Sequence, residues 1–372
     1  MPALQSPPLA ARFARAVVFG ACGFLGREVV RQLSASGALV LGIDTRPWPG
    51  ALPAGYSHNV EGSDALAEAA AYLGAGPATC SAACSAGQGA LSPGPPNGIP
   101  KGLGPLAGVQ GAEPPAGARG GAPVAFFHLA GLADAGACQR DPDLAGRLNV
   151  DLVAEALVAL SAVPCAFVFP STGIVYGDGL PRPAREDDPL LPAAEYARGK
   201  IKAEGLVRAA CAGGPLRCAI ARLSNLYGPG GGENTVLGRI LAQARAGGPL
   251  QVWDESPVRD FLFVTDAAEG LIRLGLAANT LGRPNGAEGA GGALTANLST
   301  GLGTSVGGLI DLCAELFHTS RLPQEREPGP DARPSSLVLD NSRLIALTGW
   351  QPRTSLRTGL TSSIGGARAA QE

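Results

Sequence analysis

Short apolar runs alternate with longer stretches of helical periodicity from Ala16 to residue 170. The runs are continuous rather than alternating with polar positions, and helical patterns extend through Leu33 and over 65–73 and 143–160. Continuous apolar strands separated by helices are typical of a parallel sheet that is covered on both faces. The predicted strands are AVVFG (16–20), ALVLGID (38–44), a weaker run ending at Val60, PVAFFHLAG (123–131) and CAFVFP (165–170).

The same alternation continues in the second half of the chain. Helices are predicted over 195–211 and 305–317, and strands over 216–230, where the strand runs into a glycine-rich loop, and over 293–301. Residues 258–278 are typical of a strand followed by a helix. We therefore expect an α/β protein: a Rossmann-type doubly wound parallel sheet over 16–223 and a smaller C-terminal α/β substrate lobe over 224–365, with 258–278 returning to the Rossmann domain.

Two segments do not fit this pattern. Residues 74–121 contain three charged residues and no aromatic residue, so they cannot bury a core, and we predict a disordered low-complexity insertion. A helix-to-strand connection lies at the edge of a parallel sheet opposite to the ligand-binding edge, so the insertion should be remote from the chemistry. Residues 1–15 are expected to be a flexible leader.

The charge balance and the cysteines narrow the classes of partner. The net charge is −2 over 372 residues and 16% of residues are charged, so there is no basic field for nucleic acid or an anionic membrane, and a small molecule is the expected partner. No apolar run of membrane-spanning length occurs. Eight cysteines without a CxxC pair predict free thiols in the cytoplasm and no metal site.

The stretch GACGFLG (20–26) has the spacing of a dinucleotide-binding turn between a strand and a helix. Gly20 permits the turn, Gly23 lets the backbone approach a pyrophosphate, and Gly26 lets the helix pack on the sheet. The intervening Phe24 and Leu25 belong to the same predicted cofactor site.

An acidic residue, Asp44, ends the next predicted strand. A carboxylate there accepts hydrogen bonds from the adenosine ribose and repels a 2′-phosphate, which favours NAD over NADP, although Arg46 weakens that preference.

Tyr196 and Lys200 are four residues apart on a predicted helix and therefore lie on one face. An ammonium beside a phenol stabilises the phenolate and should lower the pKa of the tyrosine. The spacing also occurs on ordinary solvated helix faces. It gains weight here from the nucleotide-binding turn and from the hydroxyls of Ser171 and Thr172, about 25 residues upstream.

These motifs together resemble the extended short-chain dehydrogenase/reductase family, the NAD-dependent nucleotide-sugar epimerases, dehydratases and reductases. The resemblance covers roughly residues 16–360, outside the insertion, and implies an enzyme that uses NAD on a nucleotide sugar. It also implies a homodimer formed through the helices at 143–160 and 195–211. The matching motifs, in order, are GACGFLG, Asp44, HLAG (128–131), Asn149–Val150, STGIVYG (171–177), YARGK (196–200), RLSNLYGPG (222–230), VRDFLFV (258–264) and TGW (348–350).

The resemblance implies a role for each catalytic residue. Counting back four positions from Tyr176 selects Thr172 rather than Ser171 as the hydroxyl that binds the reacting sugar hydroxyl. Tyr196 would take or return the proton, and Lys200 would hold the nicotinamide ribose and tune the tyrosine.

Further positions match residues that bind substrate or cofactor. Asn225 and Arg259 would bind the diphosphate of the sugar nucleotide, as an arginine fork suits that anion. The ordinary alternatives are a turn residue for Asn225 and a salt bridge to Asp260 or another acid for Arg259. Leu129 and Ala130 would line the cofactor cleft.

Three polar positions near these motifs stay open. Asp64 would contact adenine, but Ser63 occupies the position that the family's aspartate holds. His128 either lines the cofactor cleft or is packed in the core, and Asn149 is expected to support the site.

The residues after Thr172 discriminate between reactions. Dehydratases of the family have an acid pair there and decarboxylases a glutamate, whereas this chain has Gly173 and Ile174, which transfer no proton. We therefore predict an NAD-dependent epimerase of a nucleoside-diphosphate sugar, acting at C4 through a transient 4-keto intermediate.

Two alternatives stay open. The first is an NAD(P)H-dependent reductase of a nucleotide-linked 4-keto sugar, because residues 332–344 resemble the C-terminal segments of such reductases as much as those of epimerases. The second is a catalytically silent NAD-binding regulator, which the intact Tyr196 and Lys200 disfavour. The WDESP loop (253–257) replaces the family's glycine-rich turn, so the substrate is not carried over.

Overall fold

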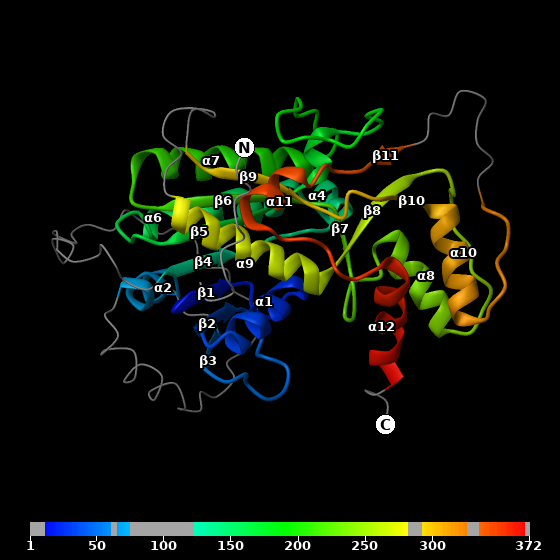
Figure 1. Ribbon diagram of the computed structural model, residues 1–372, viewed down its shortest axis with the longest axis horizontal. Coiled ribbons are helices and arrows are strands. Elements are labelled where there is room, and N and C mark those ends of the chain that lie inside the picture. Colours follow the sequence, from blue (N-terminus) through cyan, green and yellow to red (C-terminus); the bar gives the residue numbers. More distant parts are fainter. Residues whose placement is uncertain (1–11, 61–64, 75–122, 282–291, 326–334, 369–372) are drawn as a thin grey trace.

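The computed structural model describes residues 12–60, 65–74, 123–281, 292–325 and 335–368. A main α/β part and a smaller part lie side by side along the longest axis (Figure 1). Almost all of the predicted insertion at 74–121, and Asp64, lie outside the described residues.

The main part is built on a seven-stranded sheet with strand order β3-β2-β1-β4-β5-β6-β9, in which every pairing is parallel. This confirms the predicted Rossmann-type parallel sheet. Along β5 every residue is buried, which explains why the strands read as continuous apolar runs. The strands are β1 (Arg15–Phe19), β2 (Leu39–Asp44), β3 (Tyr56–Val60), β4 (Val124–His128), β5 (Ala166–Thr172), β6 (Arg217–Leu223) and β9 (Leu294–Leu298).

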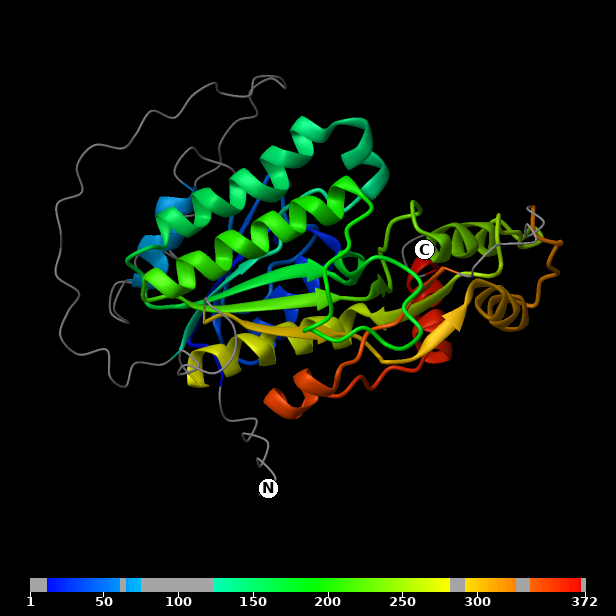
Figure 2. The same ribbon diagram turned by 90° about the horizontal axis from the view of Figure 1, so that it is seen from above.

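Helices cover both faces of this sheet (Figure 2). Successive strand residues point to opposite faces, so Val168 packs in one apolar cluster while Phe167 and Phe169 pack in the other. One face carries α1 (Phe24–Ala35), α9 (Val264–Leu281) and α11 (Ser342–Thr348); the other carries α2 (Ala65–Gly74), α6 (Leu152–Ala159) and α7 (Glu195–Gly213).

The helix predicted over 143–160 is interrupted by a π-helical segment. It consists of α5 (Pro142–Gly146), the π-helix η1 (Arg147–Asp151) and α6, and the short α4 (Ala135–Arg140) precedes it. Such π turns frequently occur at functional sites, and this one contains the buried Asn149.

The smaller part contains a four-stranded sheet in which β8 (Val258–Phe263) pairs with its three other strands. Residues 258–278 were expected to return to the main domain as a strand and a helix. The helix, α9, packs on the main sheet, whereas the strand, β8, belongs to the small sheet. Strand β9, expected in the substrate lobe, instead forms an edge of the main sheet. The other elements are β7 (Asn225–Tyr227), β10 (Gly303–Ser305), β11 (Ser336–Leu337), α8 (Val236–Arg245), α10 (Val306–Phe317) and α12 (Leu356–Arg368).

The predicted flexible leader is wrong for residues 12–15. Phe13 is buried and packs edge-on against Phe127 at 5.9 Å between ring centroids. Arg15 begins β1 and donates to the carbonyls of Tyr72 and Leu73. A large aromatic side chain next to the first strand gains more from burial than an ordered backbone costs, so the chain joins the core before Ala16.

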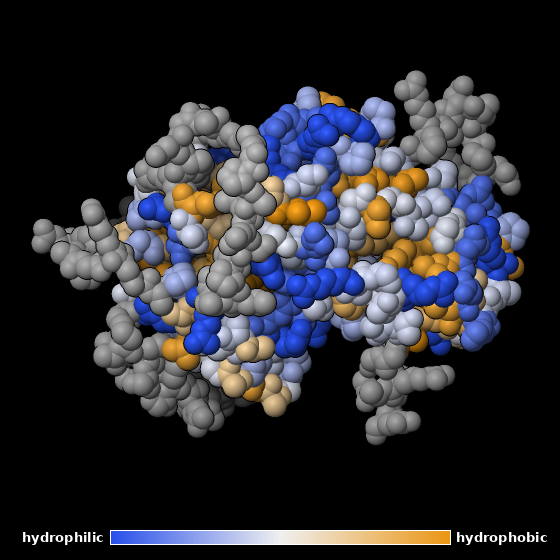
Figure 3. Space-filling view, in the orientation of Figure 1, coloured by the Kyte–Doolittle hydropathy of each residue, from blue (hydrophilic) through white to orange (hydrophobic). Residues whose placement is uncertain are grey.

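Cys22, Cys138, Cys165, Cys211, Cys218 and Cys313 are buried free thiols. Among the described residues, no helix has the length and apolar character to cross a membrane, and no group of three or more metal-ligating side chains occurs. On the face shown in Figure 3, hydrophobic and hydrophilic residues are interspersed over both parts of the molecule.

Candidate active site

The glycine-rich turn connects β1 to α1 at the carboxyl end of the sheet. Gly20 has φ +89°, and a Cβ atom there would lie 2.6 Å from the backbone nitrogen of Ala130. A Cβ atom on Gly26 would lie 2.0 Å from the Gly20 carbonyl oxygen. Gly23 begins α1 without any side-chain cap, so the N–H groups of the first turn are available to an anion.

Asp44 ends β2 beside this turn and is 8% exposed. Its carboxylate accepts hydrogen bonds from the Cys22 N–H at 2.8 Å and from the backbone and side chain of Arg46 at 3.0 and 3.1 Å. Burial opposes ionisation, but these hydrogen bonds hold the pKa of Asp44 below its ordinary value. An ionised carboxylate next to an uncapped helix N-terminus fits the ribose and pyrophosphate of a dinucleotide.

The end of β4 forms the neighbouring wall. Leu129 donates to the Phe19 carbonyl at 2.7 Å, and Ala130 packs against Gly20. Asn149 holds the following turn, since it accepts from the Leu132 N–H at 2.8 Å and donates to the Leu132 carbonyl at 3.0 Å. Asn149 thus makes the contacts of a supporting residue.

The His128 side chain is packed rather than open to the cleft. It is 1% exposed and lies among aromatic rings, including Phe19 at 5.3 Å and Phe169 at 6.2 Å between centroids. Burial, assisted by the charge of Lys200, lowers the pKa of His128 to about 4. It is therefore neutral at physiological pH.

The Lys200 side chain connects α7 to β5. It is 7% exposed, and its Nζ atom donates to the Pro170 carbonyl at 2.9 Å, two residues before Thr172. The same atom lies 4.6 Å from the centroid of the Phe169 ring and 5.9 Å from that of Tyr196. Burial lowers the pKa of Lys200 to about 8, against the opposing effect of the Glu204 carboxylate.

The expected lowering of the pKa of Tyr196 is wrong for this structure. Burial, followed by the proximity of Cys138, raises the pKa of Tyr196 above its ordinary value. Lys200 does not offset this effect of burial, because it directs its ammonium to the Pro170 carbonyl. Tyr196 is therefore a neutral phenol at physiological pH in this structure.

The two adjacent hydroxyls at the end of β5 have different surroundings. The Ser171 hydroxyl is buried and helps to lower the pKa of Glu204, although no hydrogen bond of ordinary length joins the two side chains, whereas Thr172 accepts a long hydrogen bond of 3.4 Å from the Ile174 N–H. The choice of Thr172 rather than Ser171 as the substrate-binding hydroxyl therefore stays a prediction.

Gly173 packs against the side chain of Leu339. A Cβ atom on this residue would lie 2.9 Å from both Cδ atoms of Leu339, which is fully buried. A carboxylic acid directly after Thr172 would therefore require the Leu339 side chain to shift.

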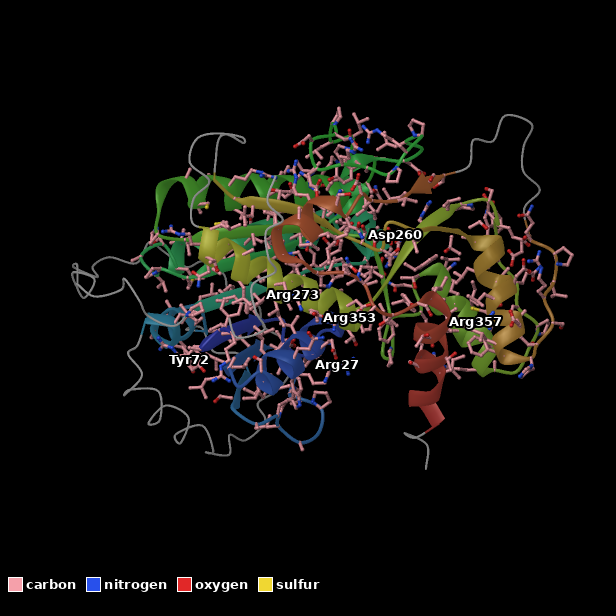
Figure 4. All side chains as sticks on the ribbon, in the orientation of Figure 1. Arg27, Tyr72, Asp260, Arg273, Arg353 and Arg357 are labelled. Carbon is pink, nitrogen blue, oxygen red and sulfur yellow. The ribbon has the colours of Figure 1, made fainter. Side chains whose placement is uncertain are left out.

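Asn225 and Arg259 lie on the paired strands β7 and β8, where the register partner of Asn225 is Phe261, two residues after Arg259. Asn225 donates to the Asp260 carbonyl at 3.3 Å, and Arg259 donates to the Ser335 and Val258 carbonyls at 3.0 and 2.9 Å. The Asp260 carboxylate is fully buried, at the junction between the two parts (Figure 4). It accepts from Thr300 and Gly301 rather than from Arg259, so the alternative of an Arg259–Asp260 salt bridge is not realised.

The loop after β7 approaches the cofactor turn from the side of the small lobe. A Cβ atom on Gly230 would lie 2.7 Å from a guanidinium nitrogen of Arg27, which extends from the first turns of α1 (Figure 4). Asn234 in the same loop donates to the Asp134 carboxylate at 2.8 Å. These contacts bring the loop after β7 beside α1, the helix that follows the predicted cofactor turn.

Two residues behind the site, Glu204 and Arg222, were not predicted from the sequence. Glu204 follows Lys200 by four residues on α7 and is 2% exposed, and Arg222 on β6 is 3% exposed. Two hydrogen bonds of 3.1 and 2.8 Å join them. The i, i+4, i+8 spacing of Tyr196, Lys200 and Glu204 could have indicated Glu204.

Comparison with known proteins identifies the family. Residues 118–285 match the sequence model of the NAD dependent epimerase/dehydratase family. The UDP-glucose 4-epimerase of Mycolicibacterium smegmatis is 30% identical over 250 residues, which are 65% of this chain and 75% of that protein. The UDP-glucuronic acid decarboxylase 2 of Arabidopsis thaliana is 31% identical over 247 residues, which are 63% of this chain and 52% of that protein.

A solved UDP-glucose 4-epimerase from Thermotoga maritima, in complex with UDP-glucose, has a TM-score of 0.69 at 21% identity and covers 96% of this chain and all of that chain. At that identity the likeness concerns the fold. Together with the more similar relative and the ordered motifs, it leads to one conclusion: the chain belongs to the NAD dependent epimerase/dehydratase family.

Proposed function

We propose that this protein is an NAD-dependent epimerase of a nucleoside-diphosphate sugar, which inverts C4 through a transient 4-keto sugar. The observation that carries the proposal is the composition of the site. Lys200 of the Tyr–Lys pair is joined to the strand that ends in Thr172, and the next two residues are Gly173, which packs against Leu339, and Ile174, neither of which can donate or accept a proton. One acid–base residue supports hydride transfer but not elimination of water.

The cofactor would be held by the turn from Gly20 to Gly26, by Asp44, and by Leu129 and Ala130. Asp44 is ionised and would accept hydrogen bonds from the adenosine ribose, which favours NAD. When bound, NAD would take up the hydride from C4 and return it to the opposite face of the sugar.

The chain's own residues would manage the proton. Thr172 would orient the C4 hydroxyl, and Tyr196 would remove its proton as the C4–H bond breaks and give a proton back to the same oxygen when the C–H bond reforms. Burial keeps Tyr196 protonated, and an ammonium ion at Lys200, 5.9 Å from its ring centroid, would favour the phenolate that acts as the base.

The nucleotide end of the substrate would lie in the small lobe. Asn225 and Arg259 would bind the diphosphate, since a guanidinium fork matches phosphate oxygens. Arg259 is held by the Ser335 carbonyl and hydroxyl rather than by the Asp260 carboxylate, and among the described carboxylates Asp178 acts on its charge. The relatives named above carry UDP sugars in their names, and a UDP sugar is the first substrate to test.

Two further predictions accompany this function. The homodimer implied by the resemblance would pair the α6–α7 faces, and Val158 on α6 is 74% exposed there. The cytoplasmic location inferred from the cysteine pattern is likewise a prediction.

The decisive experiment measures turnover with and without added cofactor. The purified protein is analysed for released NAD and then incubated with UDP-glucose, UDP-N-acetylglucosamine and UDP-glucuronic acid. Interconversion of C4 epimers without net NAD(P)H formation supports the proposal. Stoichiometric NAD(P)H consumption with a 4-keto sugar nucleotide would establish the reductase alternative, and carbon dioxide release from UDP-glucuronic acid would establish a decarboxylase.

A site variant separates catalysis from cofactor binding. Tyr196→Phe should abolish turnover and leave NAD bound. Undiminished epimerisation by this variant would refute the assignment of Tyr196.

A further inference from the structure

A buried ion pair lies directly behind the proposed catalytic residues. Arg222 on β6 donates to both carboxylate oxygens of Glu204 on α7, and both side chains are almost completely buried. Arg208, one further turn along α7, adds a contact of 3.2 Å to the same carboxylate. Desolvating two charges is costly, so a buried pair is weak evidence for stability and suggests another role.

The ion pair joins the two segments that carry the catalytic residues. Besides Glu204, Arg222 donates to the Tyr176 hydroxyl at 2.9 Å and to the Glu186 carbonyl at 3.0 Å. Tyr176 ends the 3-10 helix η2 (Gly173–Tyr176), which directly follows Thr172. The other partner, Glu204, lies on the helix that carries Tyr196 and Lys200.

A second connection runs through Tyr176, which ends the η2 helix that follows Thr172. The Tyr176 hydroxyl in turn donates to the buried amide of Asn297 at 2.7 Å, which ties η2 to β9. The position of Thr172 relative to Lys200 is therefore determined by contacts that converge on the ion pair.

We propose that Glu204 and Arg222 are positioning residues of the proposed epimerase: they lock α7 to the end of β5 and place an anion one helical turn from the Lys200 ammonium. The expected effect on turnover rests on the proposed function. The inference goes beyond that function because it assigns a role to two residues that touch neither substrate nor cofactor.

The electrostatic part of this role depends on all groups that face Lys200. His128 from β4 is neutral, Cys138 from α4 is a buried thiol, and Tyr196 is a neutral phenol, so Glu204 is the ionised group that favours the ammonium. If the charge of Glu204 is removed while Arg222 remains, the Glu204 carboxylate no longer opposes the effect of burial on the pKa of Lys200. The pKa of Lys200 should then fall below about 8, and the ammonium should be lost at a lower pH.

The test is Glu204→Gln in the full-length protein, read by the pH profile of kcat and by the pH dependence of NAD binding. We expect kcat to fall by about tenfold or more, with KM nearly unchanged, because the loss is in alignment rather than in substrate contacts. We expect the alkaline limb of both profiles to move to lower pH by about one unit. Glu204→Asp, which keeps the anion, should restore the limb toward its original position.

The matched control is Glu269→Gln on α9. It removes the same charge from another i, i+4 ion pair, with Arg273, which lies on the opposite face of the main sheet. This variant should leave kcat and both pH profiles unchanged.

A folded Glu204→Gln protein with the wild-type kcat and pH profiles would overturn the inference. If that variant does not fold, Arg222→Lys is tested instead, because it keeps both charges but loses the two-pronged guanidinium contact. This variant should lower kcat without moving the alkaline limb of the pH profile, and an unchanged kcat would overturn the inference. A wild-type protein that binds NAD but converts no nucleotide sugar would refute the proposed function and leave this inference open to test. In that case the pH dependence of NAD binding still tests the role of Glu204.

Discussion

The contact between Gly173 and Leu339 restricts which side chain can stand directly after the catalytic hydroxyl, and it can be tested by Gly173→Ala. Gly173 does not have a positive φ, so an alanine is not strained by the backbone conformation. The added Cβ would instead meet Cδ1, Cδ2 and Cγ of Leu339 at 2.9, 2.9 and 3.3 Å. Leu339 is fully buried, and its backbone is held by the Ser299 hydroxyl, so it cannot move away freely.

The magnitude can be worked out from those three contacts. Overpacking a well-packed core costs about 1–3 kcal/mol, and we expect Gly173→Ala to lower the free energy of unfolding by that amount. Leu339→Ala alone should cost about 2–5 kcal/mol because it leaves a cavity. Leu339→Ala also removes the three atoms that the new Cβ meets, so in that background Gly173→Ala should cost almost nothing.

Urea unfolding of the wild type, the two single variants and the double variant measures this coupling. We expect the double variant to be more stable than the sum of the single effects by about 1–3 kcal/mol. Gly205→Ala is the control, since no atom lies within 4 Å of its Cβ position in the middle of α7, and alanine there should stabilise the helix by about 0.5–1 kcal/mol. Additive effects at 173 and 339 would refute the claim that Leu339 occupies the space beside the catalytic hydroxyl.

Three further outcomes are expected of the site. In the wild type, kcat should fall as the pH rises through about 8, because burial lowers the pKa of Lys200 to that value and its ammonium is lost above it; a kcat that stays constant to pH 10 would contradict this assignment. Arg259→Ala should raise KM for the nucleotide sugar by about tenfold or more with little change in NAD affinity, measured by steady-state kinetics and by cofactor titration, whereas an unchanged KM would place the diphosphate elsewhere. Asp44→Asn should improve NADP binding relative to NAD by about tenfold, since it removes the anion that repels a 2′-phosphate and releases Arg46; direct titration with both cofactors decides this, and an unchanged ratio would be evidence against a ribose contact at Asp44.

The main sheet was predictable because each of its strands carries a local signal. Central strands such as β5, buried along their whole length, leave continuous apolar runs that mark both the strand and its burial. Strand β8 has the same kind of local sequence, VRDFLF, yet it belongs to the small sheet. Its neighbours β10 and β11 come from residues 303–305 and 336–337, and local sequence does not encode such long-range pairings.

The arrangement of the candidate catalytic residues could be predicted from their spacing, but their electrostatics could not. Four residues of helix place Tyr196 and Lys200 on one face and leave the direction of the Lys200 side chain open. In the structure its Nζ atom binds the Pro170 carbonyl, a partner from another element, and burial then determines the pKa of both residues. Glu204 has the same helical spacing, whereas its partner Arg222 becomes evident only when β6 lies beside α7.

The tail of the chain has a part in defining the chemistry that the linear motif alone does not reveal. In sequence, Gly173 and Ile174 merely lack an acid, and a single substitution could supply one. In the structure Leu339 comes from residues far along the chain, is anchored where Asp340 donates to the Ala184 carbonyl, and fills the space that a side chain at 173 would need. An acid at 173 would therefore require Leu339 to repack, and an acid at 174 would require the replacement of Ile174, so the site as it stands supports hydride transfer with one acid–base residue.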